Sequence, residues 1–155
     1  MAAKKYVSDI KTVNWSNQIV YDKLSDLNFL NIMFGPDNME RVKQQMGDKA
    51  PDMNIQNFVA DRDTCSFDMP PIGTIALHIE EREEPKTVKI ASDESTQFQF
   101  KLWVQLLPVN DTQCKMRVTL HIELNMMMKM MIGKKLDKGI NQIADGIAQI
   151  PFGMI

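Results

Sequence analysis

The chain contains the tripeptide His-Ile-Glu twice, as His78-Ile79-Glu80 and as His121-Ile122-Glu123. On a strand, residues two apart share a face, so each copy offers an imidazole beside a carboxylate, which is a pattern of metal ligands. The central isoleucine of each copy continues an alternating apolar pattern, which turns the histidine and the glutamate toward solvent. The two strands are not expected to be neighbours in the sheet. We therefore predict no metal site and no cofactor.

Methionines crowd the start of the last predicted helix, at Met126, Met127, Met128, Met130 and Met131. Thioethers bind soft metals, and methionine also forms adaptable apolar surfaces. No export signal accompanies the run, which argues against a copper site. We predict that these residues begin a helix packed on the sheet, with the lining of a cavity mouth as the alternative.

Few residues have the type and spacing that catalysis requires. Asp61, Asp63 and Asp68 are candidates for acid–base chemistry, but we expect them at strand ends or turns. The sequence contains no Ser-His-Asp arrangement, phosphate-binding loop or zinc spacing. Cys65 and Cys114 lie far apart and are predicted to be buried, reduced thiols of a cytoplasmic protein. We predict that the protein is not an enzyme.

Size and charge exclude several classes of protein. A chain of 155 residues with 44% hydrophobic and 25% charged residues fits one globular domain, spanning 1–155. The net charge of -2 gives no electrostatic basis for binding nucleic acid and no polybasic signal for a membrane surface. Residues 1–9 lack the apolar core of a signal peptide, and no stretch approaches the roughly 18 apolar residues of a membrane span. We expect no integral membrane association, and nothing in the sequence indicates an oligomeric state.

The N-terminal third is predicted to hold one strand and two short helices. Residues 4–13 are compatible with a strand, and Ser16 is a suitable N-cap for a helix that ends near Leu27. A second short helix would carry Phe29, Leu30, Ile32 and Met33 and would stop at Gly35-Pro36. Residues 37–50 would form either a further helical turn or a flap.

From residue 53 onward the apolar residues alternate. Met53, Ile55, Asn57 and Val59 are predicted to share a face, and Asn54, Gln56 and Phe58 to share the other. Polar or proline-rich turns at 61–63, 70–73, 83–86, 92–96 and 108–111 separate six short strands. Such a series predicts an antiparallel meander with one buried face. With residues 4–13 the sheet would have seven strands.

After Asn125 the period changes to that of a helix. Apolar residues recur every three or four positions from Met128 to Ile150, which predicts an amphipathic helix of about 24 residues, or about 36 Å, ended by Pro151. Only this helix is long enough to cover the apolar face of the sheet. Because sheets twist, seven strands should curl around it. The expected fold class is α+β.

The order of these elements resembles the START/Bet v 1-like superfamily, also called the SRPBCC or polyketide cyclase/dehydrase-like group, and most of all its short bacterial members. The supporting segments are residues 20–27, 79–88, 102–106 and the terminal helix through Ala144 and Ile150. The resemblance covers essentially the whole chain and implies a helix-grip fold. Members of that superfamily bind lipids, sterols, hormones or polyketides between the sheet and the last helix. Some are cyclases or dehydratases, and others are protein-binding co-chaperone domains.

The resemblance implies a non-enzymatic carrier or sensor whose partner is a small hydrophobic, lipid- or polyketide-like ligand. Its alternatives are a cyclase or dehydratase, and a protein-interaction module that uses the outer face around Trp103 or the helix end. The ligand would enter past residues 28–50 and the turns at 70–71 and 92–96. A filled core is the alternative to an open cavity. The residues expected to line that cavity are Phe67, Met69, Leu77, Ile90, Phe98, Phe100, Leu102, Val104, Met116, Val118, Leu120, Met128, Ile132, Leu136, Ile140 and Ile143.

Overall fold

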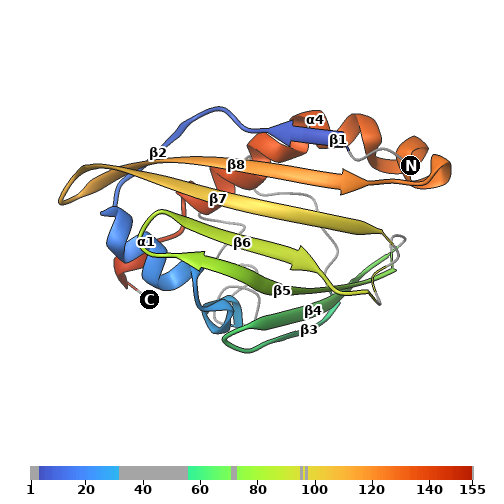
Figure 1. Cartoon of the computed structure of the whole chain (residues 1–155), viewed down its shortest axis with the longest axis horizontal. Coiled ribbons are helices and arrows are strands. Elements are labelled where there is room, and N and C mark those ends of the chain that lie inside the picture. Colours follow the sequence, from blue (N-terminus) through green and yellow to red (C-terminus); the bar gives the residue numbers. More distant parts are fainter. Residues whose placement is uncertain (1–3, 32–55, 71–72, 95, 97, 155) are drawn as a thin grey trace.

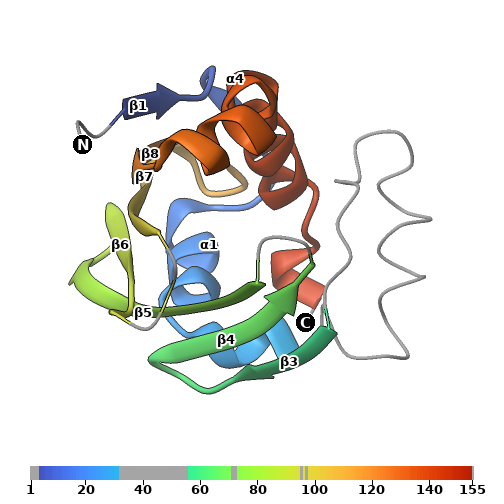
Figure 2. The same ribbon diagram turned by 90° about the vertical axis from the view of Figure 1, so that its right-hand side faces the viewer.

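The computed structural model describes residues 4–31, 56–70, 73–94, 96 and 98–154 (Figure 1). In this part of the chain, antiparallel strands form one sheet in the order β1-β8-β7-β6-β5-β4-β3, and β2 also pairs with β8. Figure 2 shows that the sheet curls around its concave side. The strands are β1 (Lys4–Val7), β2 (Lys11–Val13), β3 (Gln56–Ala60), β4 (Thr64–Met69), β5 (Gly73–Glu83), β6 (Thr87–Ser92), β7 (Gln99–Asn110) and β8 (Gln113–Glu123).

The predicted first strand is present in two halves, β1 and β2, which pair with successive parts of β8. Ser8 accounts for the interruption. Its backbone N–H donates to the carbonyl of Val118 at 2.8 Å, and its hydroxyl accepts from the N–H of Val118 at 2.9 Å. The side chain thus replaces a backbone acceptor, and the buried polar groups of β8 stay paired across the break.

Two short helices follow β2, as predicted, but the first ends at Leu24 and not near Leu27, and the second begins at Leu27. Helix α1 (Asn17–Leu24) begins after Ser16, whose hydroxyl accepts from the N–H of Ile19, and the 3₁₀ helix η1 (Leu27–Phe29) follows it. A further 3₁₀ turn, η3 (Phe152–Met154), packs against α1 at the C-terminal end. The predictions for Ile32, Met33, the stop at Gly35-Pro36 and residues 37–50 lie outside the described residues.

The predicted alternation along β3 holds from Asn57 to Val59 but is broken at Gln56, which shares the exposed face of Val59. Val59 is 65% exposed, whereas Phe58 is half-buried and stacks on Phe67 with ring centroids 6.0 Å apart. Asn57 has a φ of 53°, and the register with β4 shifts between Gln56 and Val59. This bulge moves the following residues to the opposite face, which an alternating pattern does not reveal. The predictions for residues 53–55 lie outside the described residues.

The long C-terminal helix is confirmed as α4 (Met126–Ala148), with the Asn125 side chain accepting from the N–H of Met128 at its N-cap. It packs against β8, β1 and β2, at one side of the concave face (Figure 2). The Lys11 ammonium lies 3.1 Å from the Asp145 carboxylate, and the Asn141 side chain accepts from the backbone N–H of Asp9. These polar contacts tie the helix to the strand halves beside it.

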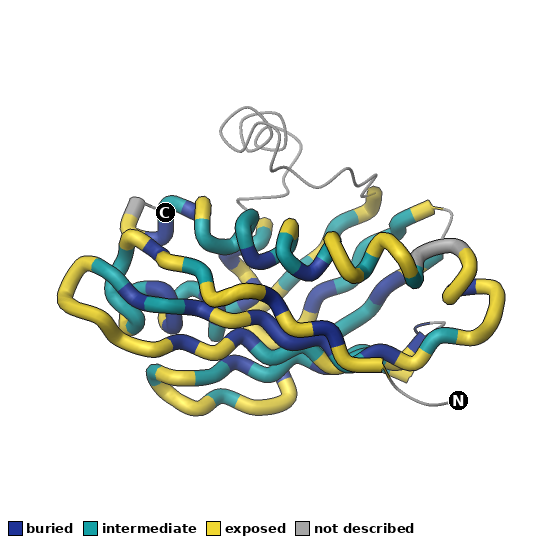
Figure 3. Tube along the Cα trace, turned by 90° about the horizontal axis from the view of Figure 1, so that it is seen from above, coloured by how far each residue is buried: buried dark blue, intermediate teal, exposed yellow. Residues whose placement is uncertain are grey.

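The methionines at the start of α4 do not pack on the sheet as predicted. Met128 is buried, but Met126, Met127 and Met130 are 80%, 71% and 83% exposed. The first turn of α4 extends past the end of β8. Most of its residues therefore have no strand to pack against and are exposed (Figure 3). Met131 is outside the described side chains. Among the described helices, none has the length and apolar content needed to cross a membrane.

Candidate functional site

The concave face of the sheet is covered most closely where α4 lies over β8. Met116, Val118 and Leu120 are buried there, and Ile140 and Ala144 face them from the helix side of the core. Burial of these side chains removes apolar surface from water and fixes the helix on the sheet. This part of the concave face is a filled core.

The predicted cavity residues divide into two groups by burial. All fifteen with described side chains are buried or half-buried. The fully buried group belongs to the core: Phe98, Val104, Met116, Val118, Leu120, Met128 and Ile140. The half-buried group packs on that core yet keeps solvent-accessible surface: Phe67, Met69, Leu77, Ile90, Phe100, Leu102, Leu136 and Ile143. Ile132 lies in α4, and its side chain is outside the described part of the chain.

The half-buried residues come from four adjacent strands and from the facing helix. Backbone pairing places Leu102 opposite both Ile90 and Leu120, so the half-buried wall continues directly from the core. Phe100 lies near Phe98, with ring centroids 5.8 Å apart. Since α4 packs on β8 and on the edge strands beyond it, the inner side chains of β4 to β7 face across from the helix and are not pressed beneath it. We call this set of eight residues the open wall.

Two further half-buried residues lie next to the open wall and were not among the predicted site residues. Phe58 stacks on Phe67, and Ile147 packs on the core one helical turn after Ile143. The spacing of apolar residues in α4 was sufficient to identify Ile147. Phe58 is hidden from sequence reasoning by the bulge at Asn57.

One end of the concave side is closed. Val20 and Tyr21 of α1 and Phe152 of η3 are buried against the sheet there. Arg82 of β5 stabilises this end. Its guanidinium donates to the Ser25 carbonyl after α1 at 2.9 Å and to the Asp63 carboxylate in the β3–β4 turn at 2.6 Å. The opposite end carries the β4–β5 and β6–β7 connections and the link from β8 to α4. Pro71, at the predicted entrance, is outside the described residues.

The titratable groups near the interior are held in neutral forms. Burial raises the pKa of the Cys65 thiol to about 12, with a smaller contribution from the Asp61 carboxylate, and burial also raises the pKa of Cys114. Burial raises the pKa of Tyr21 as well, followed by the charge of Glu84. Neither cysteine is in a disulfide. Protonated, desolvated thiols are poor nucleophiles.

The candidate catalytic aspartates lie away from the open wall. Asp61 is exposed in the β3–β4 turn, where the N–H groups of Thr64 and Asp63 donate to its carboxylate and lower its pKa. Asp68 accepts hydrogen bonds from the side chains of Asn57 and Thr74, which also lower its pKa. Both carboxylates are therefore ionised acceptors in turns and at the strand margin.

Both His-Ile-Glu copies turn outward, as predicted, with Ile79 and Ile122 buried. His78 Nδ1 lies 2.5 Å from the Asp93 carboxylate, and Glu80 lies 3.7 Å from the ammonium groups of Lys89 and Lys101. In the described part of the chain, no group of three or more histidine, cysteine or acidic side chains could hold a metal ion.

Trp103 lies on the outer face of the sheet and is half-buried. The Lys89 ammonium is 5.2 Å from the ring centroid, and the His121 ring packs edge-on at 4.7 Å. These neighbours leave only part of the indole free to meet a partner.

Comparison with solved structures identifies the fold. Norcoclaurine synthase from Thalictrum flavum matches with a TM-score of 0.59 and 10% identity over 96% of this chain and 87% of that one. A START superfamily protein from Mycobacterium smegmatis gives a TM-score of 0.58 and 12% identity over 96% and 95% of the two chains. A conserved protein from Geobacillus kaustophilus gives 0.58 and 13% over 97% and 95%. The protein therefore has the START/Bet v 1-like helix-grip fold.

Similarity to these proteins lies in structure and not in sequence. No protein-family model matches the chain, and the search of curated proteins found no match. One structure of norcoclaurine synthase is a complex with dopamine and hydroxybenzaldehyde, at a TM-score of 0.54 and 9% identity over 96% of this chain and 87% of that one. That protein thus binds small organic molecules.

Proposed function

We propose that the protein is a non-enzymatic carrier or sensor of a small hydrophobic, lipid- or polyketide-like molecule. The observation that carries the proposal is the open wall, whose phenylalanine, methionine, leucine and isoleucine side chains are apolar yet only half-buried. A ligand lying between β4–β7 and α4 would remove this remaining apolar surface from water, at roughly 25 cal/mol per Å². Ligand sites commonly combine such a wall with few polar groups.

The chemistry of the open wall supports binding without catalysis. General acid–base catalysis needs a titratable group within hydrogen-bond reach of the substrate. The described acidic candidates lie in turns or at the strand margin, and Cys65 stays protonated because burial raises its pKa to about 12. Two buried, reduced thiols also suit the cytoplasm, where we place the protein.

Displacement of a fluorescent fatty-acid analogue from the purified protein tests the proposal. We expect saturable binding of the analogue and its displacement by apolar compounds. Leu77→Trp places a larger side chain on the open wall and should weaken binding at least tenfold. Val59→Trp, on the exposed side of β3, should leave binding unchanged. Equal binding by the two variants would place the ligand elsewhere, and no saturable binding by the parent protein would contradict the proposal.

A turnover assay separates the carrier from an enzyme of the same fold. Incubation of the protein with polyketide-like or aromatic aldehyde substrates, followed by mass spectrometry, should recover them unchanged. A product that the Leu77→Trp variant fails to form would favour the cyclase or dehydratase alternative.

A further inference from the structure

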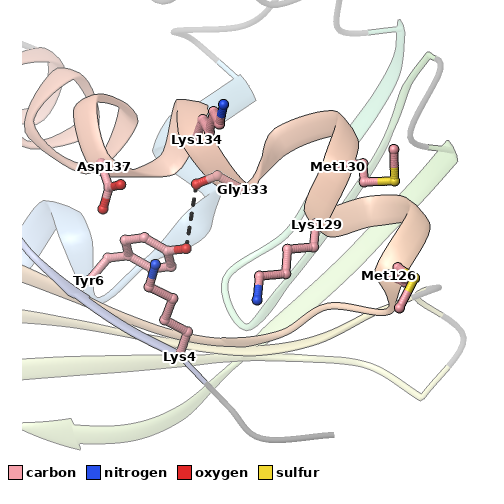
Figure 4. A pocket seen from close by; sticks show the side chains of 8 residues that line it. All are labelled: Lys4, Tyr6, Met126, Lys129, Met130, Gly133, Lys134 and Asp137. Carbon is pink, nitrogen blue, oxygen red and sulfur yellow. Dashed lines mark hydrogen bonds between the residues drawn. The ribbon is translucent and has the colours of Figure 1, made fainter.

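A groove of about 470 Å³ lies between the edge strand β1 and the first half of α4, outside the open wall (Figure 4). Tyr6 forms its floor, and the Tyr6 hydroxyl donates to the carbonyl of Gly133 at 3.5 Å. The residues that line it are Lys4, Tyr6, Met126, Lys129, Met130, Gly133, Lys134 and Asp137. We call it the β1–α4 groove.

The β1–α4 groove is basic. Lys4, Lys129 and Lys134 line it with a single carboxylate, Asp137. Lys4 extends from the strand and Lys129 from the helix into the space between them (Figure 4). The first turn of α4 contains no acidic residue, so the positive end of the helix dipole is not neutralised there. A local positive charge thus exists on a chain whose net charge is -2.

The same end of α4 carries the exposed methionines. Met126 and Met130 border the β1–α4 groove, and Met127 is 71% exposed beside them. Large apolar side chains gathered on a surface mark a place where a partner removes them from water. Flexible thioether side chains adapt to a partner without a fixed shape, such as lipid chains.

This surface lies at the end of the fold opposite to the closed one. Gln99, the first residue of β7, pairs with Glu123, the last of β8, so the β6–β7 connection lies beside the link into α4. Met69 pairs with Gly73 at the β4–β5 connection of the same end. The basic, methionine-rich surface therefore lies at the end of the sheet where a ligand would reach the open wall, next to the β6–β7 connection.

We propose that the β1–α4 groove and its three exposed methionines dock on the surface of an anionic lipid bilayer. Met126, Met127 and Met130 would enter the headgroup region, while Lys4, Lys129 and Lys134 would lie against lipid phosphates. Lysines around exposed apolar side chains are complementary to a bilayer that has negatively charged headgroups and an apolar interior. The role of this docking rests on the proposed function, since a bilayer is where an apolar ligand would be taken up or released.

Co-sedimentation of the whole protein with vesicles tests the docking. We expect binding to vesicles of phosphatidylcholine with phosphatidylserine, little binding to phosphatidylcholine alone, and loss of binding in high salt. Met126→Ser/Met127→Ser/Met130→Ser should weaken binding at least tenfold. Its control is Leu107→Ser/Val109→Ser, which removes exposed apolar side chains near the opposite end of β7 and should have no effect.

A lysine pair tests the electrostatic part. Lys129→Gln should weaken binding about fivefold, as expected for one lysine near an anionic surface, whereas Lys86→Gln in the β5–β6 turn should not. Equal binding to both vesicle types, or no effect of the methionine variant, would overturn the proposal. Binding to polyglutamate but not to vesicles would overturn it in favour of an acidic protein partner. The assay contains no fatty-acid analogue, so its failure leaves the carrier proposal standing, and the reverse also holds.

Discussion

The concave face has two parts that carry the same kind of side chain but differ in what covers them. On β8, Val118 and Leu120 are buried against α4, whereas on the neighbouring strands Leu102 and Ile90 are only half-buried. The alternating apolar pattern is equally regular in both parts. The difference comes from the helix, which packs on β8, β1 and β2 and faces the remaining strands across the interior. Apolar patterning thus predicts which side chains face inward, while the positions of α4 and, at the closed end, α1 decide which become core.

Truncation of a cross-strand pair of leucines should give the largest difference between the two parts. Leu120→Ala removes a buried side chain and should lower the free energy of unfolding by about 3 kcal/mol. Leu102→Ala, at the paired position on β7, should lower it by roughly half as much, because its side chain already meets solvent. Urea unfolding of both variants measures this. Equal losses would mean that the open wall is as tightly packed as the core.

Larger side chains should also affect the two parts differently, with a greater loss of stability in the core than in the open wall. Val118→Phe would force a ring into the filled core and should cost about 1–3 kcal/mol of stability. Ile90→Phe enlarges a side chain that keeps contact with solvent, so it should cost less than about 1 kcal/mol while weakening binding of the fatty-acid analogue. A strongly destabilised Ile90→Phe protein would show that the wall has no free space beside it.

The buried thiol of Cys65 gives a test by pH. Its pKa is raised from 9.0 to about 12 in the folded protein, so the folded state holds this proton more tightly than the unfolded chain. The resulting stability is fully present below pH 9 and is lost as the pH rises from 9 toward 12, at about 1.4 kcal/mol per pH unit. Urea unfolding at pH 8 and pH 10.5 should show a shallower loss for Cys65→Ala than for the parent protein. Parallel losses would mean that water reaches this thiol.

Substitutions on the outer face of the sheet should have the smallest effects on stability and on ligand binding. Lys89→Gln removes the ammonium above the Trp103 ring and should cost about 0.5 kcal/mol, with ligand binding unchanged. Thermal unfolding and the displacement assay measure the two effects. A matched pull-down with Trp103→Ala tests the protein-interaction alternative, because loss of a captured partner would assign a role to this face. Weaker ligand binding by Lys89→Gln would contradict the separation of the two faces.

Sequence reasoning succeeded where the signal is local and periodic. The meander, the N-cap at Ser16 and the extent of α4 follow from residue spacing, since secondary structure of this regularity repeats in the chain itself. It failed at Asn57, where one backbone conformation puts Gln56 on the exposed face of Val59 and not on the face of Phe58. It also failed at the first turn of α4, because the length of a neighbouring strand decides whether Met126 has anything to pack on.

The candidate site shows the same division at a larger scale. By itself, the sequence determined the α+β fold, the inward direction of the cavity residues and the outward direction of both His-Ile-Glu copies, since these depend on periods of two and 3.6 residues. Only the tertiary structure decided which inward residues keep contact with solvent and which lysines from the two ends of the chain meet in the β1–α4 groove. Lys4 and Lys129 are far apart in sequence, and their proximity arises from the packing of α4 on the edge of the sheet. Burial and local charge are sums over neighbours in space, which no pattern along the chain contains.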